Sequence, residues 1–285
     1  MEPVIVKARD GLELVCYLSR PSIASGPLPI VLVVHGGPWM RDRWGLNPTH
    51  QWLANRGYAV LSVNFRGSTG FGKAFLNAAN KEWGGKMQTD LIDAVDWAVS
   101  EGIADPDRIA IMGGSYGGYA ALAGLTLTPD KFACAVDLVG ISNLLTFLDT
   151  IPEYWKTRKS VYRSRLGDFS TEEGRRFLEE RAPLNHVDRI ERPLLIVQGA
   201  NDVRVKASES EQIVSAMQRH GIPVTYVLYP DEGHGVQRME NRRSYHAVVE
   251  AFLAQHLGGL CEPAGDDLAG SSIRFLAGRE LIDGL

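Results

Sequence analysis

The chain has 285 residues, which suits one large α/β domain or two small ones with a substantial buried core. A net charge of −4 gives no reason to expect a nucleic-acid or anionic-membrane partner, and 45% hydrophobic and 22% charged residues are ordinary for a soluble globular protein. Its three cysteines (Cys16, Cys134 and Cys261) are far apart and form no CxxC pair, so neither a disulfide framework nor a zinc site is expected.

The amino-terminal sequence MEPVIVKARDG has no basic start followed by an apolar stretch, so no signal peptide is expected. The longest apolar runs are of strand length, as in IVLVV (30–34), and none could span a bilayer. These features predict a protein without a membrane segment and with a cytoplasmic location.

Short apolar runs alternate with segments of helical period along most of the chain. Residues 4–8 and 12–19 are predicted strands, joined around Asp10-Gly11 as a hairpin. Further strands are predicted at 29–34, 58–64, 108–112, 133–140, 192–199 and 224–230, and helices at 47–56, 87–102, 115–127, 207–220 and about 238–257. This alternation predicts a mostly parallel sheet with helices on both faces, which is an α/β fold.

Two segments depart from the alternation. Residues 142–187 are rich in charged and aromatic side chains, and we interpret them as an insertion over the carboxyl edge of the sheet. Residues 258–285 are rich in turn-forming residues and are expected to pack loosely on the surface. The predicted organisation is therefore one domain over 1–257 followed by a tail over 258–285.

A glycine-rich stretch, IMGGSYGGYAALAGL (111–125), lies where a predicted strand becomes a predicted helix. It lacks the GK[ST] ending of a phosphate-binding loop. It also lacks the G-x-G-x-x-G spacing of a dinucleotide site, and it follows a middle strand of the chain, not the first. The third interpretation is G-x-S-x-G, with Ser115 between Gly113 and Gly117, which is typical of a nucleophile on a sharp strand-to-helix turn.

A serine nucleophile needs a base and a group that orients the base. On a sheet of this kind the acid and then the histidine follow the serine in the chain, each after a later strand. Asp202 directly follows the strand at 192–199, and His234 follows the last predicted strand between two glycines. The sequence therefore predicts Ser115, Asp202 and His234 as a catalytic triad.

Other acidic residues are weaker candidates for the orienting acid. Asp137 lies within a predicted strand and is interpreted as structural, and Asp231 and Glu232 are too close to His234 in sequence to orient it easily. Each triad candidate alone could equally be an ordinary loop residue. Their joint occurrence, in the required order and at strand ends, favours catalysis.

An oxyanion hole requires two N–H donors beside the serine. The backbone N–H of Tyr116, directly after the nucleophile, is the first candidate. The loop VVHGGPW (33–39) supplies the second, and Gly37 is favoured because Pro38 has no N–H. His35 is expected to hold this loop by hydrogen bonds and not to act as the base.

Six motifs occur in one order along the chain: HGGPW, VNFRGSTGFGKAF, MGGSYGGY, PLNHVDRI, NDVRV and PDEGHG. Together they resemble the catalytic domain of the prolyl oligopeptidase family of serine peptidases, most closely its acylaminoacyl-peptidase branch, over residues 1–257. The resemblance implies an α/β-hydrolase fold, the triad named above, and Gly37 and Tyr116 as oxyanion donors. It also implies that Arg204 contacts the substrate backbone, although a structural ion pair is an equal alternative. An apolar pocket for the acyl side chain is expected from Tyr116, Leu144, Phe147 and Trp155.

Members of this family usually carry an amino-terminal β-propeller, for which this sequence has no room, so it is either a separated catalytic domain or a naturally short hydrolase. The expected reaction is acyl transfer to water from a short peptide or a small ester, without metal or cofactor. A carboxylesterase is one alternative, and an inactive binding module on the same fold is another. Self-association into a homo-oligomer is left open.

Overall fold

In the computed structural model, which describes residues 1–22, 26–151, 154 and 159–285, one sheet runs through the whole chain. Its strands are β1 (Glu2–Lys7), β2 (Glu13–Ser19), β3 (Leu28–Val34), β4 (Ala59–Asn64), β5 (Ala104–Gly114), β6 (Cys134–Leu138), β7 (Leu194–Gly199), β8 (Thr225–Tyr229) and β9 (Arg274–Ala277). Their order across the sheet is β1-β2-β4-β3-β5-β6-β7-β8-β9.

The predicted mostly parallel sheet is confirmed. Strands β4, β3, β5, β6, β7 and β8 pair in parallel, whereas β1, β2 and β9 add antiparallel pairs at the two edges. Parallel strands require crossover connections, and most of these contain a helix. The carboxyl ends of the parallel strands therefore share one edge, where the loops can bring distant residues together.

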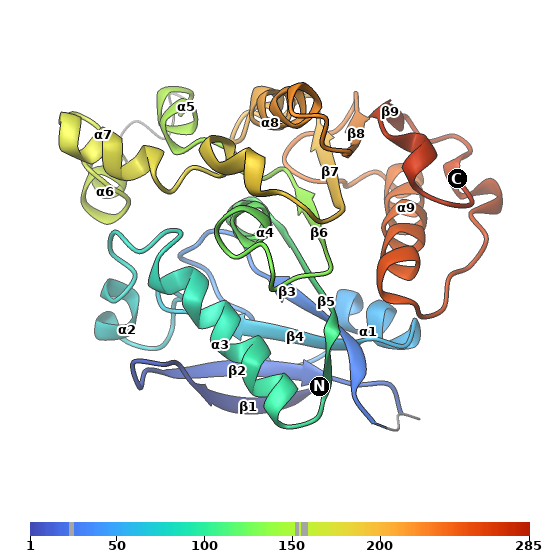
Figure 1. The fold of residues 1–285 in the computed structure, drawn as a ribbon, viewed down its shortest axis with the longest axis horizontal. Helices are drawn as coiled ribbons and strands as arrows, with labels where there is room; N and C mark the ends of the chain where they lie inside the picture. Colours follow the sequence, from blue (N-terminus) through green and yellow to red (C-terminus); the bar gives the residue numbers. More distant parts are fainter. Residues whose placement is uncertain (23–25, 152–153, 155–158) are drawn as a thin grey trace.

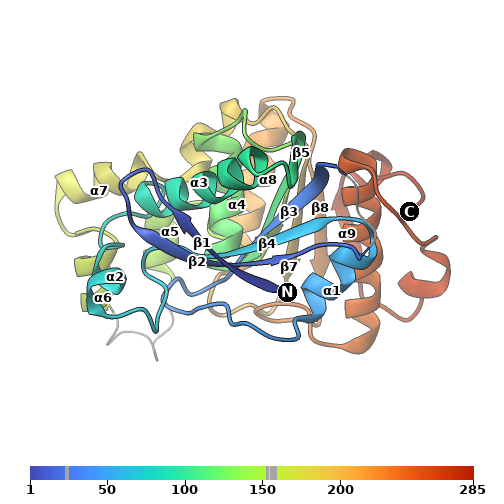
Figure 2. The same ribbon diagram turned by 90° about the horizontal axis from the view of Figure 1, so that it is seen from below.

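The helices are α1 (Pro48–Asn55), α2 (Lys73–Asn77), α3 (Lys86–Ser100), α4 (Tyr116–Leu127), α5 (Leu144–Asp149), α6 (Lys159–Arg165), α7 (Glu172–Glu179), α8 (Ala207–Arg219) and α9 (Met239–Leu257), with short 3-10 turns η2 (Pro183–Arg189), η3 (Gly265–Leu268) and η4 (Arg279–Leu281). Figures 1 and 2 both place α9 beside α1 at one end of the molecule, with α6 and α7 at the other end.

Alternate side chains of the buried strands divide the core into two. In β7, Leu194 and Ile196 belong to the core that includes residues of α3, α4 and α8. Leu195 and Val197 belong to the second core, formed with residues of α1 and α9. Because the sheet is apolar on both faces, its central strands read as continuous apolar runs, and this is why their positions are predictable from sequence.

The segment 142–187, interpreted as an insertion, lies between β6 and β7 in the chain and contains α5, α6, α7 and most of η2. The last residue of its α6 contacts the turn between α2 and α3, where the N–H of Lys81 donates to the carbonyl of Arg165 at 2.6 Å. Its η2 packs against α4 and α8. No helix among the described residues has the length and apolar character required to cross a membrane.

The tail after residue 257 differs from the expectation of loose surface packing. It contributes β9, which pairs antiparallel with β8, and it buries the side chain of Ile282 to 3% exposure. The sequence pattern underestimates this strand because only four residues take part and their side chains alternate between exposed and half-buried.

A buried ion-pair network joins the antiparallel edge to the rest of the sheet. Arg66, directly after β4, is 3% exposed and binds the fully buried Asp90 of α3 at 2.6 Å. The same guanidinium binds Asp10, in the turn between β1 and β2, at 2.9 Å. One buried cation therefore fixes three elements relative to one another, because an unpaired charge in the interior is costly.

Replacing Asp90 by alanine would leave the Arg66 guanidinium buried with only the partly exposed Asp10 as its partner. We expect the free energy of unfolding to fall by about 3–5 kcal/mol, measured by urea denaturation. Asp96→Ala on the same helix is the matched control, because it removes only a surface pair with Lys131, and it should cost less than about 1 kcal/mol. Equal losses in the two variants would contradict a dominant role for the buried network.

Candidate active site

Ser115 lies on a strained turn between β5 and α4. Its φ of 59° and ψ of −116° lie outside the regions that L-residues favour. The turn is held because the N–H of Ser115 donates to the carbonyl of Leu138 at 2.9 Å. A side chain lifted above the carboxyl edge of a parallel sheet is the arrangement that exposes a nucleophile.

The two glycines that flank Ser115 are required by close backbone contact. A Cβ on Gly117 would lie 2.1 Å from the carbonyl oxygen of Val34, at the end of β3. A Cβ on Gly113 would lie 2.6 Å from both that oxygen and the carbonyl carbon of Gly117. No rotamer change relieves a contact with backbone atoms, so only glycine lets α4 begin this close to β3.

Asp202 and His234, the predicted acid and base, lie within hydrogen-bond distance of each other. The Nδ1 atom of His234 lies 2.6 Å from Oδ2 of Asp202, whose side chain is fully buried. The other carboxylate oxygen accepts hydrogen bonds from the backbone N–H groups of Arg204 at 2.8 Å and Val205 at 3.0 Å. These bonds fix the carboxylate, and the carboxylate in turn fixes the imidazole.

The loops that carry the acid and the base are themselves joined. The N–H of Asn201 donates to the carbonyl of Glu232 at 2.8 Å. A Cβ on Gly199, the last residue of β7, would lie 2.1 Å from the carbonyl oxygen of Gly233. The last residue of β7 must therefore be glycine, so that the loop after β8, which carries His234 and is called the histidine loop below, can pass over it.

Glu232 and Asn241 hold the histidine loop and were not recognised in the sequence. The carboxylate of Glu232, 3% exposed, accepts hydrogen bonds from the N–H of Arg238 at 2.8 Å and from the side-chain amide of Asn241 at 2.9 Å. Asn241 also accepts hydrogen bonds from Ser271 and Ser272 of the tail. The sequence carries no local signal for this, because the partners lie in three separate segments.

The loop after β3 passes beside Ser115, the predicted nucleophile. A Cβ on Gly36 would lie 3.5 Å from Cβ of Ser115, and Gly37 follows with a φ of +123°. The expected role of His35 is confirmed: its ring stacks on Phe65 with centroids 4.4 Å apart and binds Ser68 Oγ at 2.9 Å. Burial lowers the pKa of His35 to about 4, so the ring is neutral near pH 7.

The remaining predicted site residues lie in different environments. The Tyr116 ring is 1% exposed and packs between Phe65, Trp83 and Tyr119. Leu144 and Phe147 are buried on α5. Arg204 is exposed beside the acid, and Trp155 lies outside the described residues.

Asp137, which was interpreted as structural, is fully buried on β6. Its Oδ1 lies 2.2 Å and 2.1 Å from the positions that a Cβ on Gly118 or on Gly140 would take. Burial raises the pKa of Asp137 to about 7. His234 binds Asp202, so Asp137 is not its partner in this arrangement.

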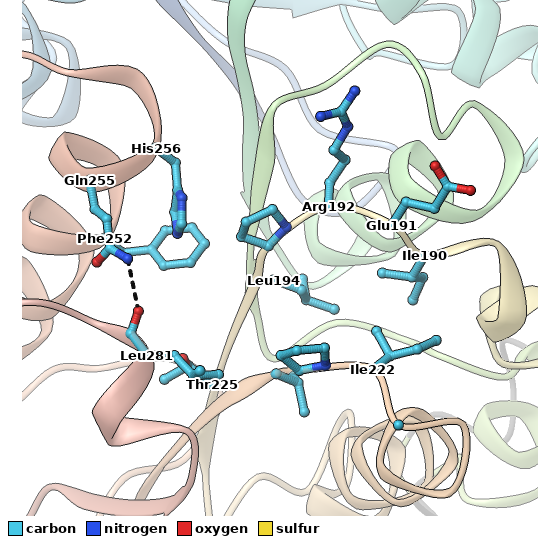
Figure 3. A pocket seen from close by; sticks show the side chains of 14 residues that line it. Ile190, Glu191, Arg192, Leu194, Ile222, Thr225, Phe252, Gln255, His256 and Leu281 are labelled. Carbon is cyan, nitrogen blue, oxygen red and sulfur yellow. Dashed lines mark hydrogen bonds between the residues drawn. The ribbon is translucent and has the colours of Figure 1, made fainter.

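Ser115 and His234 line one cavity of about 260 Å³ at the carboxyl edge of the sheet. A larger cavity of about 410 Å³ lies at the amino ends of β7 and β8, which is the opposite edge. Figure 3 shows its mostly apolar lining, including Phe252 and Ile222. Among the described residues, no group of three or more His, Cys, Asp or Glu side chains is arranged to hold a metal ion.

Comparison with known proteins supports the likeness drawn from the motifs. The family model described as "Prolyl oligopeptidase family" matches residues 44–260. Dipeptidyl aminopeptidase BIII of Pseudoxanthomonas mexicana is 58% identical over 99% of this chain and 42% of its own length. An acylamino-acid-releasing enzyme of Arabidopsis thaliana is 29% identical over 81% of this chain and 31% of its own length.

Among solved structures, a puromycin-hydrolyzing peptidase of Mycobacterium tuberculosis superposes with a TM-score of 0.85 and 31% identity. The match covers 92% of this chain and 40% of that one. The chain therefore spans less than half the length of the relatives it matches. The expected α/β-hydrolase fold is confirmed.

Gly117→Ala tests the close approach of α4 to β3. We expect the free energy of unfolding to fall by about 3 kcal/mol or more, because the added methyl group meets backbone atoms and not a movable side chain. Gly114→Ala is the matched control, because its Cβ would lie 3.7 Å from Leu138 in ordinary contact, and it should stay within about 0.5 kcal/mol of the parent. Thermal and urea unfolding measure both, and equal stability of the two variants would contradict the contact.

Proposed function

The chain belongs to the prolyl oligopeptidase family, and from this membership and its site we propose that it is the catalytic part of a serine peptidase that cleaves short peptides through an acyl-enzyme. The observation that carries the proposal is the 2.6 Å bond between Asp202 and His234, in a cavity that His234 shares with the strained Ser115. Names of relatives refer both to dipeptide and to acylamino-acid release, which supports action near the amino end of a peptide.

In the proposed reaction, His234 takes the proton of Ser115 Oγ as this oxygen attacks the carbonyl carbon. Nδ1 of His234 is bound to Asp202, so Nε2 is the atom that receives the proton. The same nitrogen then protonates the leaving amine, and a water molecule releases the acyl group in a second addition and elimination. Asp202 keeps the imidazole in one tautomer and stabilises its charged form.

The N–H groups of Tyr116 and Gly37 are proposed to bind the oxyanion. Tyr116 begins α4, so its N–H belongs to the unpaired first turn of a helix, where negative charge is favoured. The buried packing of its ring supports this role, because it fixes the backbone from which the N–H donates. Preorganised donors of this kind stabilise the transition state without moving.

The other parts of the expected site stay predictions. Arg204, which is exposed close to Asp202 in the chain, is proposed to contact the substrate backbone. Leu144 and Phe147 are proposed for the acyl side, on the insertion that follows β6. A cytoplasmic location and a homo-oligomer also stay predictions.

Asp202→Asn keeps the size of the side chain but presents an amide donor to Nδ1 of His234. The imidazole is then held in the wrong tautomer, and we expect kcat to fall by a factor on the order of 10⁴. Steady-state kinetics on the best substrate measure the change. Activity near that of the parent would contradict the assignment of the acid.

A fluorophosphonate probe and paired substrates test the reaction class. We expect covalent labelling of Ser115, none in Ser115→Ala, and turnover of aminoacyl p-nitroanilides as well as of p-nitrophenyl esters. The Ser115→Ala chain should melt within a few degrees of the parent, because alanine takes the same backbone turn without the hydroxyl.

Turnover of esters alone, with no anilide or peptide cleaved, would indicate a carboxylesterase and contradict the peptidase. Absence of labelling at Ser115 in a folded chain would indicate an inactive binding module.

A further inference from the structure

The cavity beside Ser115 is bounded by His234 and by residues of α9. Its volume of about 260 Å³ lies below the range of about 300–1,000 Å³ typical of drug-sized ligands. It therefore suits a small group, of one or two amino-acid residues. Its lining consists of Gly114, Ser115, Leu138, Val139, His234, Gly235, Val236, Gln237, Arg242, Tyr245 and His246.

The position of the imidazole indicates which part of a substrate this cavity receives. Nδ1 of His234 is bound to Asp202, so Nε2 hands the proton to the leaving group. The leaving group must therefore lie against the His234 wall when the bond breaks. The proposed oxyanion donors, Gly37 and Tyr116, are not part of this lining.

The charge of the cavity comes from Arg242. The lining has no aspartate or glutamate. The side chain of His246 is half-buried, and its pKa is lowered by burial and by the nearby Arg242, so the imidazole is neutral near pH 7. The cavity thus carries one positive charge that its own walls do not neutralise.

The neighbouring arginines on and beside α9 are paired with carboxylates, whereas Arg242 is not paired with one in the described part of the chain. Arg238 pairs with Asp231 at 3.1 Å, and Arg243 pairs with Asp267 at 2.9 Å. Arg242 forms no ion pair with any carboxylate among the residues that the structure describes. A guanidinium that is unpaired and lines a cavity is suited to bind a carboxylate in a bidentate manner.

We propose that this cavity is the leaving-group subsite, and that Arg242 binds the free α-carboxylate of a leaving amino acid or dipeptide. The inference rests on the proposed peptidase activity and names its preferred substrates, which are short peptides cleaved close to their carboxyl end. A peptide whose carboxyl end is distant or amidated cannot bring a carboxylate to Arg242 within so small a space.

The test compares leaving groups attached to one acyl part, chosen as the one that gives the fastest p-nitroanilide turnover. Alanine and alanylalanine are each used as the free acid and as the carboxamide, and the readout is the acid-to-amide ratio of kcat/KM. For at least one of the two lengths we expect a ratio of roughly 5 to 10, as for a charge-assisted hydrogen bond partly open to water. Arg242→Gln should bring this ratio close to one, and Arg242→Lys should retain part of it.

Arg243→Gln is the matched control, because it removes an adjacent arginine that points to Asp267, and it should keep the parental ratio. A structural role of Arg242 would change rates for acid and amide alike and leave the ratio unchanged. A parental ratio near one, or an unchanged ratio in Arg242→Gln, would overturn the inference while the peptidase assignment stands.

If no peptide or anilide is cleaved, the proposed function fails and the subsite is decided by binding alone. Alanylalanine and its amide are then titrated by NMR into the parent and Arg242→Gln proteins. Tighter binding of the acid, lost in Arg242→Gln, would support the carboxylate subsite. Equal binding of acid and amide would overturn it.

Discussion

The contact between the first turn of α4 and the end of β3 is the constraint on which the site depends. With glycine at 117, the backbone of α4 packs directly on the carbonyl of Val34. This packing places Ser115 on its strained turn. It also brings the loop after β3, which contains Gly36, against Ser115. Backbone strain at one residue persists only where its surroundings over-determine it, and here a helix, a strand and the Leu138 carbonyl all do so.

The predicted acid and base depend on a second set of contacts, in the loops after β7 and β8 at the same carboxyl edge of the sheet. The loops after β7 and β8 are hydrogen-bonded to each other, and Glu232 ties the histidine loop to Asn241 of α9. Asn241 is bonded in turn to the tail at Ser272, at 2.9 Å. The tail therefore supports the loop that carries His234, although it contains no catalytic residue.

Sequence reasoning reached those features whose signal is local. The G-x-S-x-G turn, the apolar central strands and the residues after strand ends each have a physical cause within a few positions, such as the absent Cβ of Gly117. It missed β9, whose partner strand β8 lies far away in the chain, and it missed the role of Asn241, which joins Glu232 to Ser272 of the tail only in the fold. The position of the Arg66 side chain was likewise unpredictable, since Asp10 and Asp90 meet only in the fold.

Two arginines with little exposure help to hold the fold, whereas Arg242 is proposed to bind a ligand. The buried Arg66 and the half-buried Arg56 each meet two carboxylates, as removal of a cation from water requires. Arg242 can remain without a carboxylate because water reaches it, and the cost of holding it unpaired is small until a substrate displaces that water. A substrate carboxylate would then bind Arg242 without competition from a carboxylate of the protein. The charge of Arg242 can therefore contribute to the choice of substrate without lowering the stability of the substrate-free protein.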